Sequence, residues 1–83
     1  MKREEALADI EMRLQKPENH EKYVQLTFEN HEGFGLLWHY NRLTEMLGLL
    51  QKENDPVQQR IYEDSFDSSL REIAIQMSRD NWK

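Results

Sequence analysis

The segment 33–50, GFGLLWHYNRLTEMLGLL, constrains the fold more than any other part of the chain, because it holds ten large apolar residues. Five of these follow one another at steps of four, three, four and three: Leu36, Tyr40, Leu43, Leu47 and Leu50. That spacing places them on one stripe of an α-helix. His39 and Met46 widen the stripe, and polar side chains occupy the opposite face. The segment therefore predicts a central amphipathic helix over 35–50.

Leu37 and Trp38 lie outside this stripe, so the first turn of the helix is apolar on nearly every side. Such a helix is either wedged between two neighbours or presents an apolar patch to a partner. We therefore expect Leu37 and Trp38 to contribute to a protein-binding surface. Pairing of two copies as a homodimer is one way to bury the excess apolar area.

The flanking segments predict helices that cover the central one. Leu7, Ile10 and Leu14 form an apolar stripe within 2–16, and Pro17 is expected to end that helix. After a polar loop over 51–55, Asp55 and Pro56 give a strong helix start. Apolar residues then recur on one side of a helix to the end of this segment. We therefore expect one long helix over 56–78, although its middle is rich in Ser and Asp.

Residues 18–32 are ambiguous. As a helix, Val24, Phe28 and His31 would line up, with Gly33 as the left-handed residue after the helix. As a strand, Val24, Leu26 and Phe28 would alternate with polar residues, in a hairpin across 22–40. We favour the helix because the second strand would not alternate. The expected fold is thus an all-α bundle of three to four helices in one domain, 1–83, with an α+β fold as the alternative.

The composition narrows the classes of partner. The chain has 83 residues, no cysteine and a net charge of −5. The charge argues against direct binding of nucleic acid, and no segment approaches the about 20 apolar residues of a membrane span. No export signal is visible behind the first residues, and the lack of cysteine fits a reducing compartment. We therefore expect a cytoplasmic location.

No motif for catalysis, a cofactor or a metal is present. His20 and His31 each precede a glutamate, but neither is followed four residues later by a second histidine, as zinc proteases require. A hairpin or a dimer could still bring His20, His31 and His39 together around a metal. The serines lack the glycines of a nucleophile elbow. The sequence therefore predicts a protein that is not an enzyme.

An acidic stretch over 62–69 offers a different partner class. Glu63, Asp64 and Asp67 alternate with Phe66 and with hydroxyl side chains, a pattern that could imitate a nucleic-acid backbone. Trp82 either pins the last helix or is free to anchor a partner, since Trp is enriched at interfaces. The main hypothesis is a small acidic module that binds a protein partner as a regulator, inhibitor or assembly factor. The alternative is an acidic mimic that blocks a DNA- or RNA-binding protein. The expected partner-binding residues are Leu37, Trp38, Glu63, Asp64, Phe66, Asp67 and Trp82.

Overall fold

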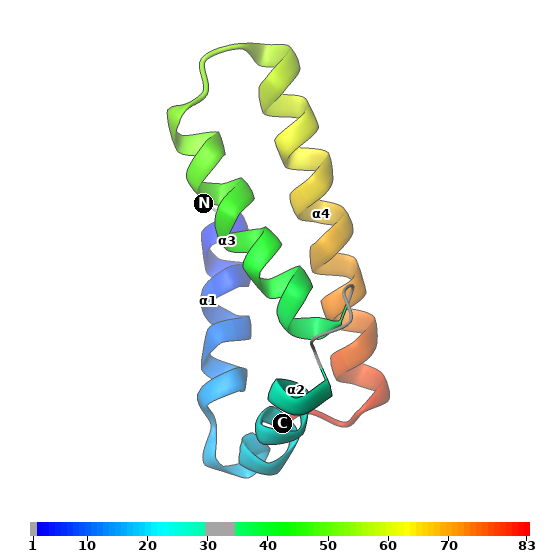
Figure 1. Cartoon of the computed structure of the whole chain (residues 1–83). Helices are drawn as coiled ribbons and strands as arrows, with labels where there is room; N and C mark the ends of the chain where they lie inside the picture. Colours follow the sequence, from blue (N-terminus) through cyan, green and yellow to red (C-terminus); the bar gives the residue numbers. More distant parts are fainter. Residues whose placement is uncertain (1, 30–34) are drawn as a thin grey trace.

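The computed structural model describes residues 2–29 and 35–83 of the chain. Within those ranges it contains four α-helices, one 3-10 turn and no strand (Figure 1). The elements in chain order are α1 (Lys2–Gln15), η1 (Pro17–Asn19), α2 (His20–Glu29), α3 (Leu36–Lys52) and α4 (Pro56–Arg79). The predicted all-α bundle is confirmed. The hairpin across 22–40 is wrong, because α2 and α3 occupy most of both proposed strands.

α3 and α4 form a long antiparallel hairpin, and this pair makes the most extensive contact between helices (Figure 1). The loop between them is shorter than predicted, since α3 continues through Lys52, whose charge favours the carboxyl end of a helix. Asp55 begins α4 as predicted: its Oδ1 accepts a hydrogen bond from the Val57 amide at 3.0 Å. Pro56 then occupies the first helical position, where its missing N–H costs nothing.

α4 runs unbroken through its Ser- and Asp-rich middle, as the sequence predicted. The polar side chains of this stretch have partners that the sequence did not show. Ser65 Oγ receives a hydrogen bond from Arg42 at 3.3 Å, and Ser69 Oγ lies 3.1 Å from Nδ1 of His39. These contacts join α4 to α3, so the tertiary structure offsets the poor helix propensity of serine and aspartate.

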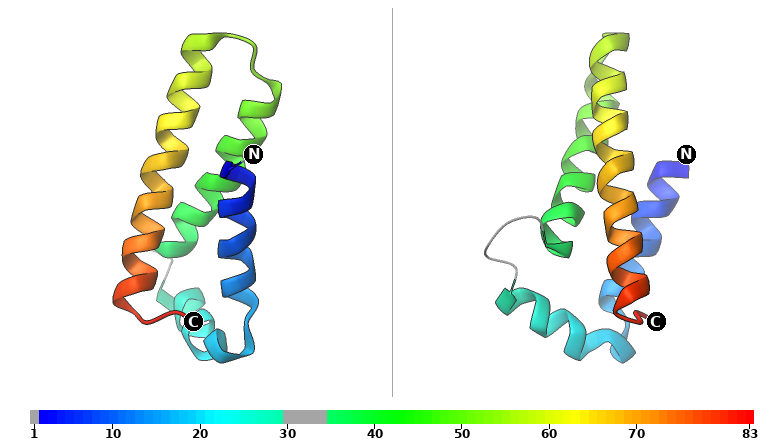
Figure 2. Two further views of the ribbon diagram at one scale, coloured as in Figure 1. Left: turned by 180° about the vertical axis from the view of Figure 1, so that it is seen from behind. Right: turned by 90° about the vertical axis from the view of Figure 1, so that its right-hand side faces the viewer.

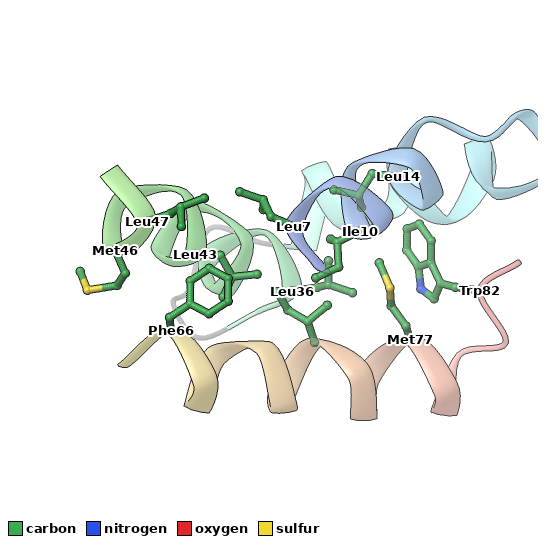
Figure 3. Close-up of a cluster of buried hydrophobic side chains, with 11 residues drawn as sticks. Leu7, Ile10, Leu14, Leu36, Leu43, Met46, Leu47, Phe66, Met77 and Trp82 are labelled. Atoms are coloured by element: carbon green, nitrogen blue, oxygen red, sulfur yellow. The ribbon is translucent and has the colours of Figure 1, made fainter. Parts of the chain in front are cut away.

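The core lies where α1, α3 and α4 face one another. Its buried side chains are Leu7, Ile10, Leu14, Leu36, Leu43, Met46, Leu47, Phe66, Ile73, Met77 and Trp82. Figure 3 shows side chains from the three helices pointing toward one another, with Phe66 of α4 directed toward α3. α1 lies against both helices of this pair (Figure 2): its backbone comes closest to α3, and Arg3 reaches Asp67 of α4 through its side chain.

α2 crosses the end of the bundle below α3 and contributes little to the core (Figure 2). Leu26 is partly buried and packs on the core, whereas Val24 is exposed and Phe28 is 73% exposed. The predicted stripe through Val24 and Phe28 lies on one side of α2, and this side faces solvent. The rest of that stripe, His31 with Gly33, lies outside the described residues.

The last residues close the lower end of the bundle with a Schellman motif. Asn81 has φ 58°, the left-handed conformation that ends many helices. The Trp82 amide donates to the Met77 carbonyl at 3.0 Å, and the Asn81 amide donates to the Ser78 carbonyl at 3.3 Å. This turn folds the Trp82 ring back onto Met77 in the core (Figure 3).

Asn19 fastens this end to α1. Its side chain is fully buried, and its Nδ2 donates to the Arg13 carbonyl at 2.7 Å while its Oδ1 accepts from the Lys83 amide at 2.9 Å. One amide side chain thus bridges the end of α1 and the residues after α4. None of the described helices combines the length and apolar character needed to cross a membrane.

Candidate functional site

A hollow of about 780 Å³ lies where α1, η1, α2 and α3 meet. Its apolar lining comes from all four elements: Leu14, Pro17, Tyr23, Leu37 and Tyr40. The polar side chains on its walls are Glu11, Gln15, Lys16 and His20. We call this feature the α1–α3 groove. It opens to solvent, and its volume falls within the range of about 300–1,000 Å³ that is typical of binding sites.

The spacing of residues along the helices explains why they meet here. Leu14 is the last member of the buried stripe of α1, and Glu11 lies one turn earlier. Leu37 and Tyr40 are three residues apart and therefore share one side of α3. η1 turns the chain at Pro17 so that α2 starts beside α1 and presents Tyr23 to the groove. The groove remains open because α2 crosses the end of the bundle instead of filling the space between α1 and α3.

Tyr40 and Glu11 form the polar contact on the groove wall. The Tyr40 hydroxyl donates to Oε1 of Glu11 at 3.2 Å. Burial raises the pKa of Tyr40 above its ordinary value, and the hydrogen bond to the Glu11 carboxylate raises it further. Lys16 also lines the groove, but its Nζ donates to the carbonyl oxygen of Lys83 at 3.0 Å. The Lys16 ammonium is therefore held toward the end of the chain.

Of the residues expected to bind a partner, Leu37 lies in the groove and is partly buried. Trp38 follows it on α3 but points to a different side, since successive helical residues are rotated by about 100°. The Trp38 ring meets the His39 ring edge-on with centroids 4.9 Å apart, and the Arg42 guanidinium lies 5.2 Å from the Trp38 centroid. The structure therefore separates Leu37 from Trp38.

The three acidic residues of the predicted partner surface form ion pairs with arginines of the same chain. Arg3 reaches from α1 to α4, where its Nε and Nη2 donate to the two carboxylate oxygens of Asp67, each at 3.2 Å. Its Nη1 lies 3.5 Å from the Glu63 carboxylate. Asp64 pairs with Arg60 at 3.4 Å. The hydrogen bonds with Asp67 raise the pKa of Arg3, and the acidic face carries less uncompensated charge than its sequence suggested.

Phe66 and Trp82 are core residues in this structure. Phe66 has no exposed surface, and Trp82 is 9% exposed. Neither side chain is exposed to a partner in the folded chain. Phe66 was chosen for its place in the acidic stretch and Trp82 as an aromatic anchor, but in a chain of this size the core needs the same aromatic residues.

Among the described residues, His39 and Ser69 make a contact that resembles a catalytic pair. The Ser69 hydroxyl lies 3.1 Å from Nδ1 of His39, yet Ser69 is only 2% exposed. A substrate could not reach this hydroxyl without separating α3 from α4, so the pair serves as an interhelical contact. Within 2–29 and 35–83, no group of three or more side chains is arranged to hold a metal ion. His31 lies outside those ranges.

Sequence reasoning missed most of the groove. Glu11, Pro17 and Tyr23 were not singled out, and Tyr40 was assigned to the core stripe. The available signal was the position of Glu11 and Tyr40 at the edges of two apolar stripes that were expected to pack together. Comparison with protein-family models, curated proteins and solved structures gave no match. Function is therefore argued from the groove itself.

Proposed function

We propose that this chain is a non-enzymatic binding module that holds an apolar segment of a larger intracellular protein in the α1–α3 groove. The observation that carries the proposal is an open hollow of about 780 Å³ whose lining is mainly leucine, proline and tyrosine. Removing one large apolar side chain of a partner from water contributes about 1.5–3 kcal/mol. A helix or extended segment that places two such side chains here has a sufficient basis for specific binding.

The surface beside the groove supports a protein partner over a small molecule. Tyr23 lines the groove, and α2 also carries the exposed apolar residues Val24 and Phe28 on a different side. Small-molecule sites usually enclose most of their ligand. An open groove on a helix that carries further exposed apolar residues suits a polypeptide better. Such a module acts as a regulator, inhibitor or assembly factor of the protein that it binds.

The nucleic-acid mimic receives less support. Asp67 and Glu63 share Arg3, and Asp64 pairs with Arg60. A mimic needs a row of carboxylates free to meet the basic groove of its target. These carboxylates would first have to leave their arginines, so we do not carry this function forward.

Affinity capture from the lysate of the host tests the proposal. The bait is the full chain, as wild type, as Leu37→Asp and as Met12→Asp. Leu37 lines the groove near the amino end of α3, where an aspartate suits the helix dipole, and circular dichroism of the variant checks that its helix content equals that of wild type. Met12 is 58% exposed on α1 and lies outside the groove, so it is the matched control.

We expect a partner that wild type and Met12→Asp retain at both low and high salt and that Leu37→Asp loses. Apolar contacts tolerate salt, whereas exposed charge pairs are screened. A partner lost at high salt but insensitive to Leu37→Asp contradicts the proposal and returns attention to the acidic face. Light scattering of the pure chain then determines whether a second copy is itself the partner: a dimer mass that Leu37→Asp reduces to one chain would show it.

A further inference from the structure

Glu11 is a partly buried carboxylate on the groove wall, and the described residues supply no cation to it. Arg3, Arg13 and Arg60 each pair with an aspartate or a glutamate of the described chain. Glu11 is partly buried, and its one described polar contact is the hydrogen bond from Tyr40 to Oε1. No described residue forms an ion pair with it. The wall of an apolar groove thus contains a carboxylate whose remaining acceptor capacity is met by solvent.

A partner that fills the groove removes that solvent. Removing a carboxylate from water without giving it a new hydrogen-bond donor costs much free energy. A cation that donates hydrogen bonds is the best replacement for the lost water. The neighbouring tyrosines, Tyr23 and Tyr40, suit the same cation, because arginine and lysine pack favourably against aromatic rings. Lys16 also lines the groove, and its ammonium is held by the Lys83 carbonyl.

We propose that the partner segment carries an arginine or lysine that pairs with Glu11, next to the apolar side chain that fills the groove. The inference rests on the proposed function and specifies the chemistry of its partner. On a helical partner the two side chains lie three or four residues apart, so that both face the groove. The net charge of −5 favours the approach of such a basic segment.

The test uses a library of random 16-residue peptides displayed on phage and selected on the full chain at physiological salt. Selected peptides are synthesised, and their affinities are measured by fluorescence anisotropy against wild type, Leu37→Asp, Glu11→Gln and Glu5→Gln. Glu11→Gln removes the charge but keeps an oxygen that accepts from Tyr40. Glu5→Gln makes the same change of net charge on an exposed part of α1, away from the groove, so it controls for general attraction of basic peptides.

We expect peptides that bind wild type and Glu5→Gln alike and bind Glu11→Gln about 10- to 100-fold more weakly, the range for losing a hydrogen bond to a charged group. Replacing the peptide's arginine by citrulline, or its lysine by acetyl-lysine, should weaken binding to wild type to the same degree. The same peptide change should have little further effect on binding to Glu11→Gln. That result would show that the peptide cation and Glu11 act as one pair.

Two other results separate this inference from the function on which it rests. Peptides that require Leu37 but bind Glu11→Gln as tightly as wild type overturn the basic partner and leave the groove as a binding site. If no selected peptide loses affinity on Leu37→Asp, the groove does not bind polypeptides, and both the proposed function and the inference fail.

Discussion

Replacing Asn19 should destabilise the fold more than any other polar substitution in the lower end of the bundle. Asn19 is fully buried, and its two hydrogen bonds, to the Arg13 carbonyl and from the Lys83 amide, fix the orientation of its amide. Asn19→Ala removes both and leaves the Arg13 carbonyl and the Lys83 amide without that partner. A fully buried group left unpaired costs about 1–3 kcal/mol, and these two hydrogen bonds are only part-buried, so we expect a total loss of about 2–4 kcal/mol in the free energy of unfolding.

Asn19→Asp keeps the shape and the acceptor for Lys83 but places a carboxylate oxygen against the Arg13 carbonyl. Burial and this repulsion raise the pKa of the new carboxyl above the ordinary value of about 3.9 for aspartate. A raised pKa in the folded state makes the neutral form the favoured one. Stability is therefore retained below about pH 3.9 and is lost as the pH rises through the raised pKa.

Urea unfolding followed by circular dichroism at 222 nm, between pH 4 and pH 8, measures both effects. Each variant is compared with wild type at the same pH, so that other titrating groups cancel. Asn41→Asp is the control, because Asn41 is exposed on α3 and the change should stay within about 0.5 kcal/mol. A loss below about 1 kcal/mol for Asn19→Ala, or a pH-independent loss for Asn19→Asp, would refute the role assigned to this side chain.

Three further predictions concern single positions. Gly48→Ala should raise the stability by about 1 kcal/mol and the melting temperature by about 4–8 °C, because a Cβ at Gly48 meets no atom within 4 Å; an unchanged or lower melting temperature would contradict the open space at this position. Asn81→Val should cost about 1–2 kcal/mol while Asn81→Gly costs nothing, since φ is 58° there; equal effects in thermal unfolding would argue against the left-handed turn. Because the pKa of Tyr40 is raised in the folded state, its neutral hydroxyl stabilises the fold. This stabilisation is present at pH values up to the ordinary tyrosine pKa of 10.0 and is lost as the pH rises through the higher pKa of the folded state. Tyr40→Phe should remove this part of the alkaline loss, measured by urea unfolding from pH 8 to pH 11, and identical slopes for both proteins would disprove it.

Local sequence signals predicted the helices well. The repeated three- and four-residue steps from Leu36 to Leu50 predicted α3, because one buried stripe is enough to specify a helix. Asp55 and Pro56 predicted the start of α4, since capping depends only on neighbouring residues. The error at Lys52, where α3 continues past the predicted end, is small because the ends of helices are weakly specified.

The signals that failed all depend on contacts between distant residues. Asn19 reads as a loop residue, and only the Lys83 amide, 64 positions away, shows it to be a structural bridge. Asp67 reads as a free acid, yet Arg3, also 64 positions away, neutralises it. The sequence aligned Val24 with Phe28 on one side of a helix, but the position of α2 across the bundle end decides that this side faces solvent.

The candidate site was predicted only at Leu37. The sequence shows that the start of α3 carries excess apolar surface, but not which neighbours frame it. The groove exists because η1 turns the chain at Pro17 and α2 crosses the bundle end, and neither the turn nor its direction follows from a periodic pattern. Glu11 matters through its place on the groove wall, beside Tyr40, and a single carboxylate on an amphipathic helix gives no such signal.

Site-specific photocrosslinking in the cells of the host tests the central claim most directly. A benzoylphenylalanine replaces Leu37, in the groove, or Met12, on the exposed outer side of α1. If the groove holds a segment of another protein, the probe at position 37 should form one discrete adduct on illumination and the probe at position 12 should not. No adduct at position 37, or the same adducts at both positions, would contradict the assignment of the α1–α3 groove as the binding site.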